Sequence, residues 1–286
     1  CLNHRPYFFN GVLDQGYWPD GLCTAPTDDA LRADIIRMKR LGFRLMRKHC
    51  KIEPLRWYYH CDRLGMVVWQ DMVNGGESYD MKRLCYLPTV LPKLTEGKSW
   101  SAAAAGRKNM KGCQEWLAEC RETIRTLYNS PCVGAWVIFN EGWGQFATEP
   151  VTRMVKKADP SRPVDSASGW FDCGCGDIKS VHNYFETLIC PKDRRTGKIE
   201  EARACVISEY GGLAHAIEGH LSSDRVYGYR KLKTGEEFQR RYEQFQSQLK
   251  KLQREGLSAA IYTQVSDIED EINGIYTYDR KVCKLQ

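Results

Sequence analysis

Residues 132–146, CVGAWVIFNEGWGQF, decide the fold that we predict for this chain. Residues 133–139 are apolar, mostly β-branched or aromatic, and about as long as one strand. This pattern is typical of a strand that is buried on both faces, as in a parallel sheet covered by helices. The run ends abruptly at Asn140 and Glu141. Because a carboxylate there is costly unless the strand opens onto a cleft, we expect a functional glutamate; an ordinary solvated glutamate is the alternative.

Apolar runs that end in polar residues recur along the chain. They predict eight strands, at residues 6–13, 43–47, 66–69, 133–139, 163–168, 179–184, 205–208 and 257–264. Helical patterns lie between most of them, at residues 28–41, 54–65, 111–128, 149–158 and 236–255. Such βα units predict an α/β protein with a (β/α)8 TIM barrel. A doubly wound sheet is the alternative, but NGVLDQGYWPDG at the first strand lacks a glycine-rich phosphate motif.

The composition narrows the class of protein. A chain of 286 residues with 42% hydrophobic and 27% charged residues is ordinary for a globular protein, and we predict one domain over residues 1–286. The net charge of +6 is scattered, so nucleic-acid binding is not expected. No apolar run is long enough to span a membrane, and the first residues, CLNHRPYFFNG, show no signal-peptide pattern. The 13 cysteines form no paired C-x-x-C clusters, so no metal site is predicted.

One segment, residues 74–112, interrupts the alternation of strands and helices. It contains several glycines, two prolines and a run of alanines. A connection of this length inside a compact domain is usually a functional loop or an inserted lid. We therefore predict that it borders the substrate entrance after the third strand.

Two glutamates occupy corresponding places at strand ends. Glu141 follows the fourth predicted strand and Glu209 the seventh. In a barrel of eight strands both carboxyl groups can face the same cleft at the carboxyl ends. Retaining glycosidases need such a pair about 5 to 5.5 Å apart, with one carboxyl protonated as the acid and the other ionised as the nucleophile.

These residues resemble a known family. Asn140-Glu141 and Ser208-Glu209-Tyr210-Gly211 resemble motifs of the glycoside hydrolase family 2 barrel, the group of β-galactosidases, β-glucuronidases and β-mannosidases. Further segments resemble that family in the same order: FNGVLDQGYWPDG, GFRLMRKH, WYYHCDRLGMVVWQDM, VHNYF and TQVSDIEDEINGIYTYDRKVCK. The resemblance covers nearly the whole chain. It implies a carbohydrate substrate, a retaining β-glycosidase activity and no cofactor.

The resemblance also implies roles for single residues. Glu141 matches the acid/base and Glu209 the nucleophile. Asn140 matches the residue that binds the 2-hydroxyl of the sugar, and Tyr184 and Arg47 match two residues beside the nucleophile.

Other predicted site residues rest on position alone. Trp143 is a candidate for the apolar wall that raises the pKa of the acid. Further side chains at or near strand ends are predicted to bind the sugar, with solvated or barrel-wall positions as the alternative: Asp14, Asp71, His182 and Asp267. We interpret the acidic run at residues 269–271 as a solvated loop.

Two other functions stay open at this point. A non-catalytic carbohydrate-binding barrel would use both glutamates as hydrogen-bond acceptors. A metal-dependent hydrolase would use a set of imidazoles and carboxylates: His49, His182, Asp71 and Asp267. The resemblance further implies β-sandwich domains before the barrel in a full-length chain. Because residue 286 comes about where an eighth helix would begin, we expect a fragment that lacks the last helix.

Overall fold

The computed structural model describes residues 2–86, 96, 98–190 and 202–285. Its main sheet has eight strands, and every hydrogen-bonded pair in it is parallel. They are β1 (Phe9–Asp14), β2 (Leu45–Lys48), β3 (Val67–Asp71), β4 (Val133–Asn140), β5 (Val164–Ser168), β6 (Ile178–Asn183), β7 (Ala204–Gly211) and β10 (Ala259–Thr263). All eight predicted strands are confirmed, with their ends shifted by up to a few residues.

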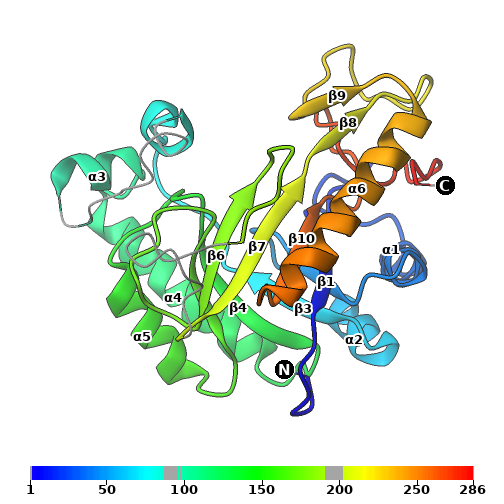
Figure 1. Cartoon of the computed structure of the whole chain (residues 1–286). Coiled ribbons are helices and arrows are strands. Elements are labelled where there is room, and N and C mark those ends of the chain that lie inside the picture. Colours follow the sequence, from blue (N-terminus) through cyan, green and yellow to red (C-terminus); the bar gives the residue numbers. More distant parts are fainter. Residues whose placement is uncertain (1, 87–95, 97, 191–201, 286) are drawn as a thin grey trace.

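The strand order makes the sheet a nearly closed barrel. It runs β5-β4-β3-β2-β1-β10-β7-β6, so β5 and β6 are its two edges. These edges meet at both ends: the Asp177 N–H donates to the Val164 carbonyl at 2.8 Å, and Ser168 Oγ lies 3.2 Å from His182 Nε2. Figure 1 shows the strands gathered in the middle of the molecule. The predicted TIM barrel is confirmed.

The predicted helices are also present, on the outside of the sheet (Figure 1). They are α1 (Asp28–Arg40), α2 (Leu55–Leu64), α4 (Met110–Leu127), α5 (Thr148–Ala158) and α6 (Gly235–Arg254). Local signals explain their limits. The Thr27 hydroxyl accepts from the Ala30 N–H at 3.1 Å at the start of α1, and Gly65, at φ +64°, ends α2. No helix in the described ranges is long and apolar enough to cross a bilayer.

Two apolar layers hold the barrel together. The larger layer joins strand residues such as Trp136 and Ile138 with helix residues such as Ile124 of α4 and Val155 of α5. A smaller layer holds strand residues alone and fills the barrel interior: Phe9, Leu13, Leu45, Val67, Trp69, Ala135, Val137, Ile178, Val206, Ala259 and Ile261. Arg47 pairs in register with Leu13 and Trp69 of this inner layer. The register therefore turns Arg47 into the barrel mouth.

Three regions differ from the simple βα alternation. The segment at residues 74–112 contains a short π-helix, η1 (Lys82–Tyr86), and α3 (Ser99–Ala104), and it projects beyond the barrel (Figure 1); residues 87–95 and 97 of this prediction lie outside the described residues. After β7 a small parallel sheet follows, β8 (Leu213–His215) with β9 (Arg230–Leu232), which the sequence patterns did not predict. Residues 264–285, after β10, form turns and isolated bridges without a helix.

Candidate active site

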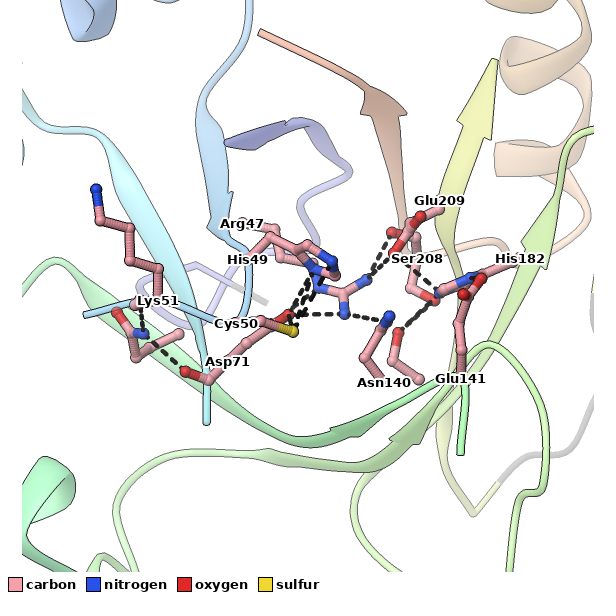
Figure 2. Close-up of polar contacts among 12 residues, drawn as sticks. Arg47, His49, Cys50, Lys51, Asp71, Asn140, Glu141, His182, Ser208 and Glu209 are labelled. Carbon is pink, nitrogen blue, oxygen red and sulfur yellow. Dashed lines mark hydrogen bonds and ion pairs between the residues drawn. The ribbon is translucent and has the colours of Figure 1, made fainter. Parts of the chain in front are cut away.

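Arg47 lies at the centre of the polar cluster in the barrel mouth, and its side chain is fully buried (Figure 2). Its Nε and Nη2 atoms each lie 2.9 Å from an oxygen of Asp71. Nη2 also donates to Asn140 Oδ1 at 2.7 Å, and Nη1 donates to Glu209 Oε1 at 3.1 Å and to the Ser208 carbonyl at 3.2 Å. Every N–H of the guanidinium therefore has a protein acceptor. One side chain joins the carboxyl ends of β2, β3, β4 and β7.

Glu209 lies on β7 and receives two donors. Arg47 holds Oε1, and the Tyr184 hydroxyl donates to Oε2. Tyr184 comes directly after β6, and its oxygen also lies 3.4 Å from Thr263 Oγ1 on β10. Two donors, one of them charged, stabilise negative charge on the Glu209 carboxylate.

Glu141 follows β4 with its backbone in the left-handed region, at φ +54°. Its Oε1 atom lies 2.7 Å from His182 Nδ1, and His182 Nε2 lies 3.3 Å from Glu209 Oε1. A single buried imidazole thus contacts both glutamates (Figure 2). Oxygens of these two carboxyl groups, which come from different strands, lie within 4.8 Å of each other.

Burial shifts the pKa values of Glu141 and His182 in opposite directions. It raises the pKa of Glu141 to about 7 and lowers the pKa of His182 to about 4. Near neutral pH the imidazole is therefore uncharged, and a large share of Glu141 is protonated.

The hydrogen-bond directions agree with a protonated Glu141. The Ser168 hydroxyl donates to Ser208 Oγ at 2.9 Å, so it can accept from His182 Nε2–H at 3.2 Å. A neutral imidazole then has no proton on Nδ1, and this nitrogen must accept. The contact at 2.7 Å is satisfied when Glu141 O–H donates to it.

The structure brings together most of the predicted site residues: Arg47, Asp71, Asn140, Glu141, His182, Tyr184 and Glu209. Asp14 and Asp267 do not join them. Asp14 Oδ2 lies 2.6 Å from Lys48 Nζ, and Lys284 Nζ lies 2.6 and 2.8 Å from the two oxygens of Asp267. Each of these aspartates forms an ion pair with a buried lysine, and sugar binding by Asp14 and Asp267 stays a prediction.

Trp143, the predicted apolar wall, packs on a small apolar cluster, and its effect on the pKa of Glu141 stays a prediction. Its ring lies 5.6 Å from that of Tyr79, and it packs on the buried cluster that includes Leu84 and Phe171. Sequence reasoning missed Trp170, which contacts both Glu141 and His182. Its Nε1 donates to the Glu141 carbonyl at 3.1 Å, and its ring centroid lies 5.3 Å from that of His182. Its position just after the fifth predicted strand is the feature from which the sequence could have predicted it as a site residue.

The acidic run at residues 269–271 is only partly a solvated loop. Glu269 and Asp270 are exposed, as predicted, but Glu271 is partly buried and accepts from Asn273 Nδ2 at 2.8 Å. Burial also raises the pKa of Glu271. The prediction of a solvated side chain is wrong for Glu271.

In the part of the chain that the structure describes, two groups of side chains have the atoms that metal ions prefer: His49, Cys50 and Asp71, and Glu141, His182 and Glu209. In the first group, both Asp71 oxygens already bind the Arg47 guanidinium, whose charge opposes a cation there. The set considered from the sequence is not one of these groups, and its Asp267 forms an ion pair with Lys284. We assign no step to a metal.

This barrel with paired carboxyl groups at its mouth defines a glycosidase-like site. Residues 1–283 match the family described as "Glycosyl hydrolases family 2, TIM barrel domain". The chain belongs to this family.

Curated relatives and solved structures agree with this membership. The chain is 28% identical to a β-galactosidase of Aeromonas hydrophila over 230 residues, which cover 71% of this chain and 19% of the relative. It is 25% identical to a β-galactosidase of Erwinia tasmaniensis over 245 residues, 79% of this chain and 20% of the relative. The chain thus spans about a fifth of these relatives' length.

Two solved structures show the same fold. A β-D-glucuronidase of Dictyoglomus thermophilum aligns with a TM-score of 0.70 at 17% identity, over 98% of this chain and 49% of that one. A family 2 β-galacturonidase of Eisenbergiella tayi, bound to galacturonate, aligns with a TM-score of 0.66 at 18% identity, over 97% and 49%.

Proposed function

We propose that the chain is the catalytic barrel of a retaining β-glycosidase, with Glu141 as acid/base and Glu209 as nucleophile. The observation that carries the proposal is the single imidazole of His182, which contacts both carboxyl groups, at 2.7 and 3.3 Å. An oxygen of Glu141 and an oxygen of Glu209 lie within 4.8 Å of each other. This short separation is in keeping with the about 5 to 5.5 Å of retaining enzymes rather than the about 6.5 to 9.5 Å of inverting ones.

The different surroundings of the glutamates support their different roles. Burial raises the pKa of Glu141 to about 7, which keeps a proton available near neutral pH. Glu209 instead accepts from Arg47 and Tyr184, which stabilise the charged form that attacks carbon. The site therefore holds one proton donor and one nucleophile.

The reaction follows from these roles as two displacements. In the first, Glu209 attacks the anomeric carbon while Glu141 protonates the glycosidic oxygen, and the bond to the aglycone breaks. In the second, Glu141 removes a proton from water, which attacks the glycosyl-Glu209 ester and releases the sugar. Asn140, whose Oδ1 accepts from Arg47 at 2.7 Å, would bind the 2-hydroxyl, where hydrogen bonds strengthen in the transition state.

Covalent trapping tests the proposal. The purified protein is incubated with a panel of 2-deoxy-2-fluoro glycosyl fluorides, which slow the second displacement, and then digested for peptide mass mapping. We expect one added glycosyl group, on Glu209. Label on another residue would overturn the assignment, and binding of sugars without any label or product would favour a carbohydrate-binding barrel instead.

A further inference from the structure

The backbone on both sides of Glu271 is hydrogen-bonded to the loop segment at Tyr227. The Tyr227 N–H donates to the Asp270 carbonyl at 2.6 Å, and the Ile272 N–H donates to the Tyr227 carbonyl at 3.0 Å. These bonds form a bridge between Tyr227 and Glu271. The segment after β10 is therefore fastened to the segment before β9, with Glu271 at the junction.

A chain of side-chain amides fixes the direction of the Glu271 carboxylate. Gln15 donates to Gln264 at 3.0 Å, Gln264 donates to Asn273 at 2.8 Å, and Asn273 donates to Glu271 Oε1 at 2.8 Å. Gln264 and Asn273 are almost completely buried. A satisfied buried network of this kind holds its members in one arrangement. The Gln15 side chain also forms a hydrogen bond with the Glu271 carboxyl group.

The carboxylate of Glu271 lies at the mouth of the barrel, because the amides that hold it begin at Gln15, directly after β1, and pass through Gln264, directly after β10. Burial raises its pKa, the charge of Glu209 raises it further, and the His49 imidazole lowers it. The same loop region carries Tyr229, whose ring stacks on Tyr184 next to Glu209. Glu271 therefore belongs to the wall that a bound sugar would meet.

The basic side chains at the end of β2 are already committed to protein acceptors: Arg47, Lys48, His49 and Lys51. Arg47 and His49 both bind Asp71, and every N–H of Arg47 is used. Lys48 and Lys51 each lie 2.9 Å from Glu53 Oε1. At this end of β2 no cation is left to pair with a second carboxylate, which a buried carboxylate requires.

We propose that Glu271 determines specificity: its carboxylate accepts hydrogen bonds from hydroxyls of a neutral glycone and excludes uronic acids, whose carboxylate would face it. This inference rests on the proposed glycosidase function. A site that hydrogen-bonds a substrate hydroxyl discriminates strongly against a substrate that leaves its polar group unpaired. Two carboxylates brought together at low exposure add repulsion.

Matched substrate pairs test the inference. The purified protein is assayed on p-nitrophenyl β-D-glucoside against β-D-glucuronide, and on the galactoside against the galacturonide, which differ only at C6. We expect kcat/KM to favour the neutral member by about 100-fold or more. Glu271→Gln should reduce this ratio about tenfold, and Glu271→Lys should reduce it further by raising turnover of the uronide.

Glu269→Gln is the matched control, because it makes the same change at an exposed neighbour and should leave the ratio unchanged. A parent protein that prefers a uronide would overturn the inference but leave the glycosidase proposal intact. So would an unchanged ratio in Glu271→Gln, or an equal fall in Glu269→Gln. A parent that cleaves no pair and takes no 2-fluoro label would overturn both.

Discussion

Tyr229 lies flat on Tyr184, with ring centroids 3.8 Å apart and ring planes only 6° from parallel. The Tyr184 hydroxyl donates to Glu209. Tyr229 comes just before β9. Both rings pack on Gly212, which follows β7 at φ +60°, so closely that a Cβ atom there would clash with them. The stack fixes the ring plane that aims the Tyr184 hydroxyl at the proposed nucleophile.

Removing the stacked ring should weaken this alignment. Because an aromatic pair contributes about 0.5 to 1.5 kcal/mol, we expect Tyr229→Ala to lower kcat by roughly 3- to 10-fold. Tyr229→Phe keeps the ring and should stay close to the parent in a kcat measurement on a nitrophenyl glycoside. An equal loss in both variants would show that the Tyr229 hydroxyl, not the stack, is needed.

The raised pKa of Glu141 predicts an alkaline limb in the pH profile. The acid step needs protonated Glu141, and this form predominates below about pH 7. We therefore expect kcat/KM on an alkyl glycoside to fall as the pH rises through about 7. In Glu141→Ala, kcat/KM on a dinitrophenyl glycoside, whose first displacement needs no acid, should persist and lose this limb. A limb that survives the substitution would assign it to another group.

His182 should tune the position of that limb. If Glu141 donates its proton to Nδ1, the imidazole stabilises the neutral acid, and its removal lowers the pKa of Glu141. One lost hydrogen bond of about 1 kcal/mol corresponds to a shift of roughly one pH unit. We expect the limb of His182→Ala to move downward by that amount in a kcat/KM profile. A shift upward would mean that Nδ1–H donates to a carboxylate instead.

The barrel could be predicted from the sequence because each strand and helix has a local signal. An apolar run such as residues 133–139 and a cap such as Thr27 act within a few residues. The contacts of the site are not local. Asp14 and Asp71 both lie at strand ends, yet Asp14 forms an ion pair with Lys48 and Asp71 forms one with Arg47.

The same lack of local signal explains why the sequence did not predict the roles of three further residues. Trp170, Tyr229 and Glu271 lie on loops whose composition resembles solvated surface. Their roles depend on loops from distant parts of the chain, as when the Tyr227 segment bridges to Glu271. Register and loop docking of this kind leave no periodic signal in the sequence.

The segment at residues 74–112 should support the acid/base through Arg107. Its Nε donates to the Gly144 carbonyl at 2.7 Å, and its guanidinium lies over Phe146 at 4.9 Å. We expect Arg107→Met to lower kcat/KM for alkyl glycosides by about tenfold, the value of one charged hydrogen bond, and to spare dinitrophenyl glycosides. Arg107→Lys, which retains charge, should lose less. Equal losses on both substrates would indicate general damage to the fold.

The ion pair of Lys284 and Asp267 should contribute to stability rather than catalysis. Both side chains are almost fully buried, and Lys284 Nζ also donates to the Ile272 carbonyl at 2.9 Å. Removing one partner of a buried pair typically costs about 3 to 5 kcal/mol, so Lys284→Met should lower the free energy of unfolding in urea by that amount. The double variant with Asp267→Asn should recover part of the loss. Strict additivity would show that the two side chains do not interact.

The edges of the barrel, β5 and β6, share no ladder of backbone bonds, although both strands are fully described. At their carboxyl ends the edges are joined by Ser168 and His182, and His182 extends the junction to both glutamates. The contact that closes the barrel at this end is thus made by side chains that would also contact the sugar. A glycone analogue that binds these groups binds only the closed barrel and therefore stabilises it. Such a ligand would slow amide exchange along β5 and β6 and raise the melting temperature.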